Sequence, residues 1–426
     1  MFIDFTVENY RSIKEPVTLS AVAQSHGANE QDNRIAEPFS YPPRKLEILP
    51  VLGIFGANAS GKSNVINALG NLLSSIHYNL HYLDDYRASY TLETPFKLDG
   101  EWTQLPSRFE LRVLANGNIY IYTLALNKHR ILHEKMSYIP KDSKRATSRL
   151  LYERTWMDAL KEYSVKNGSD FGEKYRELQL SVKDSQIFLG LVAGNLNNEF
   201  LNPFISWITF YAAYAGVRGG SNDDEILACI LLTPTANKSD IIRKVTMILK
   251  KFDTGIEDVE IVGPRFLGKE HPEFEIWVTH KTKAGNVKWL LSEESLGTRQ
   301  LFTLAARLFN VLRAGGIVLI DELGFGTHPK INREIVRLFQ DKKINKKGAQ
   351  LIFTSHDTTL LSKGLLRRDQ IWFTQKREDG STELYPLSDF AGIRSDLVID
   401  KAYLDGRFGA VPFLPDKEEL TELLGV

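Results

Sequence analysis

Two glycines, a lysine and a serine in the stretch Gly56 to Ser63 have the types and the spacing that bind a phosphate group. The stretch reads Gly-Ala-Asn-Ala-Ser-Gly-Lys-Ser and matches the P-loop pattern G-x-x-x-x-G-K-[ST]. Its glycines let backbone N–H groups surround phosphate oxygens, Lys62 can reach the β and γ phosphates, and the Ser63 hydroxyl can bind Mg²⁺. The predicted nucleotide contacts here are Gly56, Asn58, Ala59, Ser60, Gly61, Lys62, Ser63 and Asn64.

The residues on either side of this stretch support the same chemistry. An apolar run at residues 49–55 predicts a strand before it, and a helix is expected to open at Asn64. A chance glycine-rich turn, the alternative, would need neither flank.

Two carboxylates, Asp321 and Glu322, follow the apolar run 316–320. Such a run predicts a buried parallel strand, and ligands bind at the carboxyl ends of strands in open α/β sheets. Asp321 is therefore predicted to hold Mg²⁺ through water, and Glu322 to polarise an attacking water. The alternative is a surface turn after a core strand, which the P-loop in the same chain disfavours.

A histidine, His356, ends a second apolar strand at residues 351–355. It lies 35 residues after Asp321, beyond one predicted helix (331–339), as a neighbouring strand of a doubly wound sheet would. We expect His356 to sense the γ-phosphate, and the alternative is a structural or solvated histidine.

A further anion site is predicted just before the apolar helix 301–312. The segment 294–300 places a serine, Ser295, where it can cap the helix, with Gly297 two residues later. The alternative is a plain helix cap without a ligand. Arg11, in the segment 9–13 after the first strand, is either another contact to the nucleotide or a solvated surface residue.

The elements that must position these residues belong to an ordinary globular chain of 426 residues. Its 53 basic and 53 acidic residues give a formal net charge of zero, which argues against a surface wholly devoted to nucleic acid but permits a local basic patch.

One cysteine, Cys229, lies in an apolar run and is expected to be a buried small hydrophobe. The N-terminus alternates like a strand, so we expect no signal peptide, and no run approaches the roughly 20 apolar residues of a membrane span. We expect a soluble, cytoplasmic protein that does not associate with a membrane.

The chain divides into three predicted parts. Residues 1–140 hold the P-loop and an antiparallel hairpin around Asn116-Gly117-Asn118. Residues 141–270 are expected to form a helical insert, and residues 271–426 begin with a second hairpin around residues 284–286. Helix, strand, helix and strand then follow over residues 292–375, so both chain ends contribute to the predicted site.

The order of these motifs resembles the ABC-type ATPases of the SMC and RecF branch over residues 1–70 and 287–375. The resemblance implies an α/β fold: a P-loop ATPase head with an antiparallel β subdomain and a helical insert. It also implies that Ser295 and Gly297 contact the γ-phosphate bound by a second subunit, and that His328 occupies the D-loop. The segment has Glu294, Leu296 and Thr298 where transporter ATPases have Leu, Gly and Gln, which disfavours a transporter subunit. No Q-loop glutamine is placed, and Gln104 is a weak candidate.

A closer resemblance, to the AbiL/RloA-type, OLD-like ATPases of bacterial phage-defence operons, extends into the tail. It rests on residues 355–358, 367–373 and 403–412. For the Arg367-Arg368 pair a solvated helix end is an equally good interpretation. Acidic residues near the C-terminus are interpreted as part of a terminal amphipathic helix at 415–424 and not as a nuclease centre.

By this resemblance the chain is an ATPase that acts as a sensor or scaffold in antiviral defence, with ATP and Mg²⁺ as cofactors. Lys62, Glu322 and His356 are the predicted catalytic residues, and Ser63 and Asp321 the metal ligands. The implied partners are a second copy of the chain, in a dimer or higher oligomer, and a separately encoded effector. A nucleic acid or a phage protein is the candidate trigger. The alternative is a RecF-like DNA-binding ATPase of replication or repair.

Overall fold

Both ends of the chain contribute strands to one sheet, in the order β14-β15-β5-β16-β17. These strands are β5 (Val51–Gly56), β14 (Ile317–Ile320), β15 (Gln350–Thr354), β16 (Ile371–Lys376) and β17 (Thr382–Pro386). The first four run parallel, and β17 pairs antiparallel with β16. The structure, a computed structural model, describes residues 1–24, 35–41, 44–81, 92–143, 145–195, 198–208, 238–252, 254–265, 273–393, 397–412 and 421–422.

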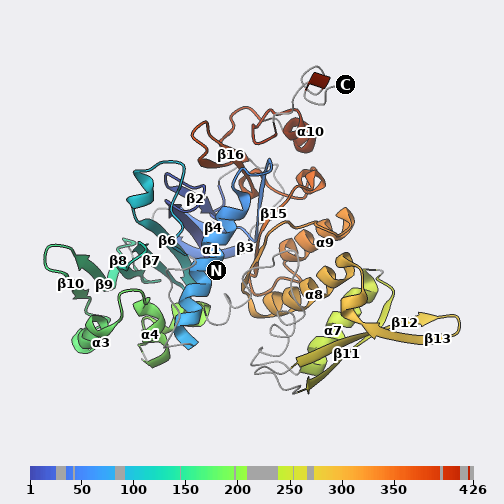
Figure 1. Ribbon diagram of the computed structural model, residues 1–426, viewed down its shortest axis with the longest axis horizontal. Helices are drawn as coiled ribbons and strands as arrows, with labels where there is room; N and C mark the ends of the chain where they lie inside the picture. Colours follow the sequence, from blue (N-terminus) through green and yellow to red (C-terminus); the bar gives the residue numbers. More distant parts are fainter. Residues whose placement is uncertain are drawn as a thin grey trace.

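Helices cover both faces of this core sheet (Figure 1). Every residue of β5, β14 and β15 is buried, as the apolar runs predict. In β5, Leu52 and Ile54 join the cluster that contains α1 (Lys62–His81), whereas Val51 and Phe55 join the cluster that contains α9 (Pro329–Gln340). The alternation of side chains along a strand therefore fixes one helix on each face of the sheet.

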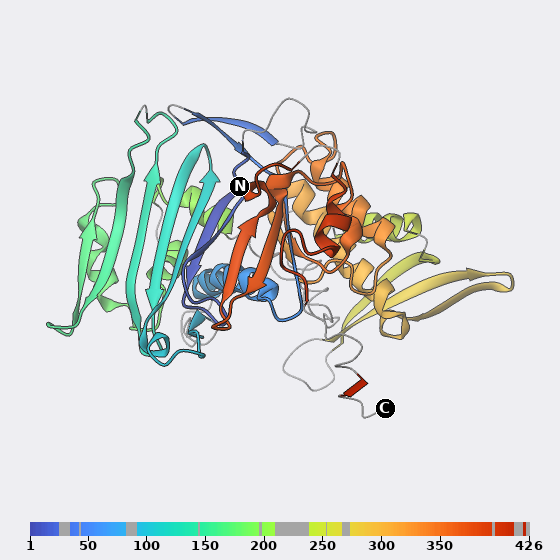
Figure 2. The ribbon, with the colours of Figure 1, turned by 90° about the horizontal axis from the view of Figure 1, so that it is seen from above.

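A seven-stranded antiparallel sheet lies beside the core sheet, in the order β10-β9-β8-β7-β6-β1-β2 (Figure 2). The hairpin predicted at Asn116-Gly117 is confirmed: both residues have positive φ, 49° and 80°, as a tight two-residue hairpin turn requires. Helix α1 packs in one cluster with both sheets. The strands are β1 (Phe2–Glu8), β2 (Val17–Ser20), β6 (Ser107–Ala115), β7 (Asn118–Leu126), β8 (Ile131–Ile139), β9 (Arg149–Met157) and β10 (Glu162–Asn167).

The segment predicted as a helical insert, 141–270, is only partly helical in its described residues. It opens with β9 and β10, which extend the seven-stranded sheet, and ends in β11 (Ile256–Arg265). Polar and charged residues interrupt the alternation in β9, so the local pattern conceals a strand that cross-strand pairing with β8 stabilises. Its helices are α3 (Arg176–Ser181), α4 (Phe188–Asn195), α5 (Asn202–Trp207) and α7 (Lys238–Lys251), with a 3-10 turn, η2 (Glu173–Tyr175).

A third sheet of three antiparallel strands carries the second predicted hairpin. It contains β11, β12 (Glu273–Thr282) and β13 (Gly285–Leu290), in that order. The turn lies at residues 283–284, one residue earlier than predicted. Helices α7 and α8 (Leu296–Ala314) share one apolar cluster with this sheet. The β12–β13 hairpin projects away from the core (Figures 1 and 2).

The remaining described elements are short. They are β3 (Ile35–Tyr41) and β4 (Arg44–Ile48), which pair with each other, α10 (Ile399–Leu404), and the 3-10 turns η1 (Trp102–Gln104), η4 (Leu291–Glu293), η5 (Thr358–Leu361), η6 (Arg368–Gln370) and η7 (Leu387–Asp389). Cys229 lies outside the described residues, as does the expected terminal helix apart from residues 421–422. Within the described part of the chain, no helix combines the length and apolar character needed to cross a membrane.

A fully buried carboxylate, Glu134 on β8, fixes helix α4 to the seven-stranded sheet. Its oxygens accept from the backbone N–H groups of Phe188 and Leu189, both at 2.9 Å, at the first turn of α4. The hydroxyls of Tyr122 and Tyr152 donate to it at 3.2 and 3.1 Å. Burial raises the pKa of Glu134, although these N–H groups and the facing Arg154 lower it. Because α4 packs against α1, this carboxylate indirectly supports the P-loop helix.

We expect Glu134→Ala to lower the free energy of unfolding by about 3 kcal/mol, because it removes the acceptor of four buried donors and an acidic group that faces Arg154 across the strands. Denaturant unfolding measures this change. Glu162→Gln, an exposed carboxylate at the start of β10, is the matched control and should change stability by less than about 0.5 kcal/mol. Equal, small effects of the two substitutions would contradict the assigned role of Glu134.

Candidate functional site

The P-loop lies between the carboxyl end of β5 and the start of α1, as predicted. Lys62 turns back over the loop, and its Nζ donates to the carbonyl oxygens of Gly56 and Ala57, both at 2.8 Å. Burial lowers the pKa of Lys62 to about 8, although the nearby carboxylates of Asp321 and Glu322 raise it. The ammonium is therefore held at the loop, close to the acidic pair.

Strands β16 and β17 hold the P-loop in shape through two threonines that sequence reasoning missed. Thr374 Oγ1 lies 2.6 Å from Ser60 Oγ, and Thr382 Oγ1 donates to the Ser60 carbonyl at 3.0 Å. Gly61 has φ of 105°, and any side chain there would collide with Thr382. The second glycine of the pattern is thus required both by its backbone conformation and by the close approach of β17.

The acidic pair meets the P-loop through shared hydrogen bonds. Ser63 Oγ donates to Asp321 Oδ1 at 3.0 Å, and Thr354 Oγ1 donates to the same oxygen at 2.7 Å. The Glu322 backbone N–H donates to Thr354 Oγ1 at 2.7 Å. Glu322 has φ of 62°, so its side chain leaves the strand in an unusual backbone conformation of the kind found at functional sites. Thr354, at the end of β15, is the residue that fixes both acids, and no motif marks it.

The oxygen ligands expected for Mg²⁺ are present as a pair. The Ser63 hydroxyl and the Asp321 carboxylate lie side by side, and oxygen is the ligand that Mg²⁺ prefers. Within the described ranges, no group of three or more His, Cys, Asp or Glu side chains could hold a metal ion alone. The pair therefore fits an ion that takes its other ligands from water and phosphate, as Mg²⁺ commonly does.

His356 completes this group at the end of β15. Its side chain is exposed, and desolvation by neighbouring atoms together with the Lys62 cation lowers its pKa. The Glu322 and Asp321 carboxylates have the opposite effect and raise the pKa of the same ring. The structure thus brings together the P-loop, Asp321, Glu322 and His356, which the sequence places far apart.

Ser295 caps α8, and the start of this helix packs closely against Gly326 in the predicted D-loop. The Thr298 N–H donates to Ser295 Oγ at 3.2 Å. A side chain at Gly297 would collide with the Gly326 carbonyl, so a glycine is needed for this approach. His328 caps α9, accepting from the Lys330 N–H at 3.2 Å. These contacts join Ser295, Gly297 and the predicted D-loop into one surface.

Arg11 lies in a turn that touches the start of α1. Its backbone is left-handed, with φ of 53°, and its guanidinium lies 5.4 Å from the centre of the Tyr10 ring. Next to it, Ser12 Oγ accepts from the Asn64 amide at 2.6 Å and lies 2.7 Å from Thr382 Oγ1. The Asn64 side chain, predicted to contact nucleotide, thus also anchors this turn to the P-loop helix.

Arg367 and Gln104 lie in different environments. Arg367 is buried and forms two hydrogen bonds with Asp369, at 2.9 and 2.8 Å, so at this position the solvated helix end is wrong. Asp369 also accepts from the Gln24 N–H, which ties the 3-10 turn η6 to the N-terminal segment. Gln104 is exposed on η1, where its amide donates to the neighbouring Thr103 hydroxyl.

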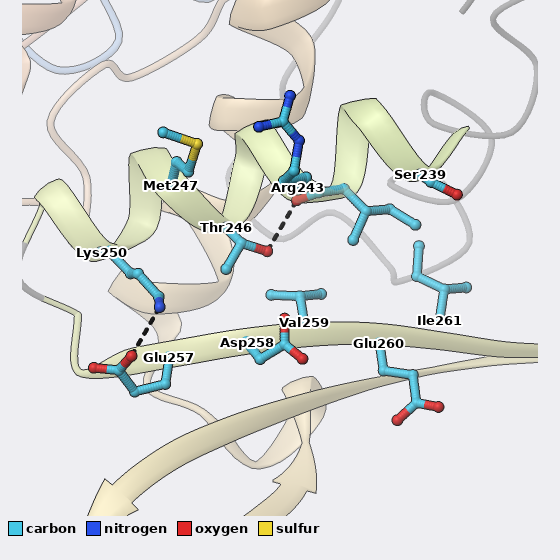
Figure 3. A pocket seen from close by; sticks show the side chains of 11 residues that line it. Ser239, Arg243, Thr246, Met247, Lys250, Glu257, Asp258, Val259, Glu260 and Ile261 are labelled. Atoms are coloured by element: carbon cyan, nitrogen blue, oxygen red, sulfur yellow. Dashed lines mark hydrogen bonds and ion pairs between the residues drawn. The ribbon is translucent and has the colours of Figure 1, made fainter. Parts of the chain in front are cut away.

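A separate groove of about 490 Å³ lies between α7 and β11 (Figure 3). It contains no predicted site residue. Several of its polar groups are already paired: Lys250 pairs with Glu257 at 2.8 Å, and the Thr246 hydroxyl donates to the Ile242 carbonyl. The groove therefore does not alter the assignment of the site to the P-loop end of the core sheet.

Comparison with known proteins gives one family and several similar folds. A family model described as "AAA domain, putative AbiEii toxin, Type IV TA system" matches residues 51–362. A search of curated proteins found no match. Among solved structures, an SMC head bound to the C-winged helix domain of ScpA is 12% identical, with a TM-score of 0.41, and the alignment covers 95% of this chain and 99% of that one.

Two more SMC heads give similar values. The SMC head domain from Thermotoga maritima is 12% identical with a TM-score of 0.41, over 90% of this chain and 98% of its own. The SMC head with an extended coiled coil from Pyrococcus furiosus, bound to the C-terminal domain of ScpA, is 12% identical with a TM-score of 0.36, over 96% and 98%.

Proposed function

The chain belongs to the AAA-domain family whose model covers residues 51–362, and from this premise we propose that it hydrolyses ATP as an ABC-type ATPase in antiviral defence. One observation carries the chemical part: Ser63, Asp321 and Thr354 form a continuous hydrogen-bonded group at the P-loop, next to Glu322. This arrangement supports the proposal that phosphate, a cation and the attacking water bind at a single edge of the core sheet.

Each residue has a separate role in the proposed reaction. Lys62 and the P-loop N–H groups bind the phosphates, and Ser63 and Asp321 would hold the Mg²⁺ that neutralises phosphate charge. Glu322 orients and deprotonates the attacking water, and His356 contacts the γ-phosphate. Ser295 and Gly297 belong to a surface that completes the site of a second copy, which makes the active unit a dimer of heads.

The biological part of the proposal follows the family description and the resemblance to AbiL/RloA-type, OLD-like proteins. The chain would act in the cytoplasm as a sensor or scaffold that assembles with ATP and controls a separately encoded effector. Its native operon should protect cells from phage in plating assays, and Lys62→Ala should abolish protection at an unchanged protein level. Protection by the Lys62→Ala operon equal to that of the parent would reject ATP-dependent control.

A RecF-like role remains the second candidate because of one basic loop. Lys342, Lys343, Lys346 and Lys347 are exposed between α9 and β15, and the buried Asn345 holds the loop through bonds to the Phe339 and Ala349 carbonyls. Such a loop could contact a phosphate backbone. Salt-sensitive stimulation of the ATPase by duplex DNA, lost when these four lysines become glutamate, would favour this alternative over a protein trigger.

The pKa of Lys62 leads to a pH-dependent prediction. ATP binds the protonated ammonium, which is depleted as the pH rises through about 8 in the nucleotide-free protein. Between pH 7 and pH 9 the affinity for a non-hydrolysable ATP analogue should therefore fall about tenfold. Lys62→Arg should bind with little pH dependence over this range, since a guanidinium stays charged. Parallel pH profiles for the two proteins would show that Lys62 does not control binding.

A further inference from the structure

A largely buried polar cluster lies at the entrance to α8, one residue before Ser295. Glu294 Oε1 lies 2.6 Å from His280 Nε2 and accepts from the Trp289 indole N–H at 2.7 Å. The His280 ring stacks on Trp289, with centroids 4.2 Å apart and planes 9° apart. The Glu294 and His280 side chains are only 10% and 15% exposed. We refer to Glu294, His280 and Trp289 as the Glu294 cluster.

Both partners of Glu294 come from the projecting hairpin. His280 is on β12 and Trp289 is on β13, two strands paired in antiparallel register (Figure 1). One carboxylate oxygen therefore joins both strands to the residue that precedes the cap of α8. A hydrogen-bonded carboxylate of this kind is geometrically specific and costly to remove when it is largely buried.

Helix α8 is also packed between two cores. Leu301, Phe302 and Ala305 share an apolar cluster with Ile276 and Val278 of β12. An adjoining face of α8, with Leu304, Leu308 and Val311, packs in the cluster of the core sheet. A movement of the three-stranded sheet relative to the core sheet would therefore be transmitted to α8 and to the segment that caps it.

We propose that Glu294 is a positioning residue for ATP hydrolysis, because the Glu294 cluster fixes the backbone on which Ser295 is presented to the nucleotide. A movement of the β12–β13 hairpin would therefore change the position of Ser295 and, with it, the rate of hydrolysis. This inference rests on the proposed function, since it requires Ser295 to act on ATP. It also explains why an acidic residue stands at position 294, where transporter ATPases have leucine.

Substitutions at Glu294 test the inference in the full-length protein. Glu294→Ala removes both bonds and should lower kcat about tenfold, whereas Glu294→Gln keeps an acceptor for Trp289 and His280 and should stay within about twofold of the parent. The Kd of a non-hydrolysable ATP analogue should remain unchanged in both, because the P-loop is intact. Glu260→Ala, which removes an exposed carboxylate paired with Lys288 on the same sheet, is the matched control and should leave kcat unchanged.

Tryptophan emission provides a readout that does not depend on hydrolysis. Glu294→Ala should change the emission spectrum, and the change should vanish when Trp289 is also replaced by phenylalanine. The inference would be overturned if Glu294→Ala had the emission spectrum of the parent or the kcat of the parent. Neither result would contradict ATP hydrolysis by the parent protein. A parent protein without ATPase activity would reject the proposed function and this inference together. If Glu294→Ala does not fold, Trp289→Phe alone decides: kcat about threefold lower supports the inference, and an unchanged kcat overturns it.

Discussion

Glu322→Gln is expected to bind ATP like the parent and to hydrolyse it about 10²- to 10³-fold more slowly, because an amide cannot accept the proton of the attacking water. The backbone of Glu322 is fixed by Thr354 and its side chain is exposed next to His356 and Lys62, so the exchange of one oxygen for nitrogen should not disturb the fold. Phosphate release and binding of a fluorescent ATP analogue measure the two effects separately.

Two comparison variants distinguish loss of the catalytic base from loss of nucleotide binding. Lys62→Ala removes a charge-assisted contact and should weaken ATP binding about 30- to 100-fold. Glu334→Gln, at an exposed carboxylate of α9 that pairs with Arg337, should change neither binding nor turnover. Parent-like turnover in Glu322→Gln would show that another group activates water.

Local sequence was sufficient to predict the residues at the ends of the core strands. The runs before Gly56, Asp321 and His356 are continuously apolar because their strands are buried on both faces, and the P-loop has a fixed internal spacing. Asn116-Gly117 predicted a hairpin because both residues tolerate positive φ. These features depend on neighbours within a few positions of the chain.

The supporting residues could not be predicted, because their roles arise only when distant segments pair. Thr354, Thr374 and Thr382 lie in strands where threonine is common for reasons of β propensity. Their hydroxyls reach Asp321 and Ser60 only because the sheet places β15 next to β14, and β16 and β17 in order beside β5. The same limit explains the missed strands β9 and β10, whose place is set by pairing across the seven-stranded sheet.

The proposed role of Ser295 in the site of a second copy leads to the second large expected effect. In the proposed dimer, the P-loop of each copy meets the Ser295 surface of the other, so twofold symmetry produces two identical composite sites. Glu322→Gln with ATP should therefore show a doubled molecular mass by light scattering. In a protein that is already a constitutive oligomer, the mass would not change, and the mixing experiment below decides.

Two inactive proteins should restore activity when mixed. Lys62→Ala destroys the P-loop, and Ser295→Arg fills the anion site of the capping segment while leaving the P-loop intact. A dimer of either protein alone has two defective sites, but a mixed dimer has one site that combines an intact P-loop with an intact Ser295. With random exchange, half of the dimers are mixed, and only one of the two sites in each mixed dimer works. We therefore expect about a quarter of the parent activity.

The reciprocal mixture separates action between chains from action within one chain. The double variant Lys62→Ala/Ser295→Arg, mixed with an equal amount of parent, forms mixed dimers in which each site contains one damaged half. Action between chains therefore again leaves about a quarter of the activity, all of it from parent dimers. If Ser295 instead served its own P-loop, this mixture would retain about half, and the mixture of single variants would stay inactive. That pair of results would assign Ser295 and Gly297 to the site of their own chain.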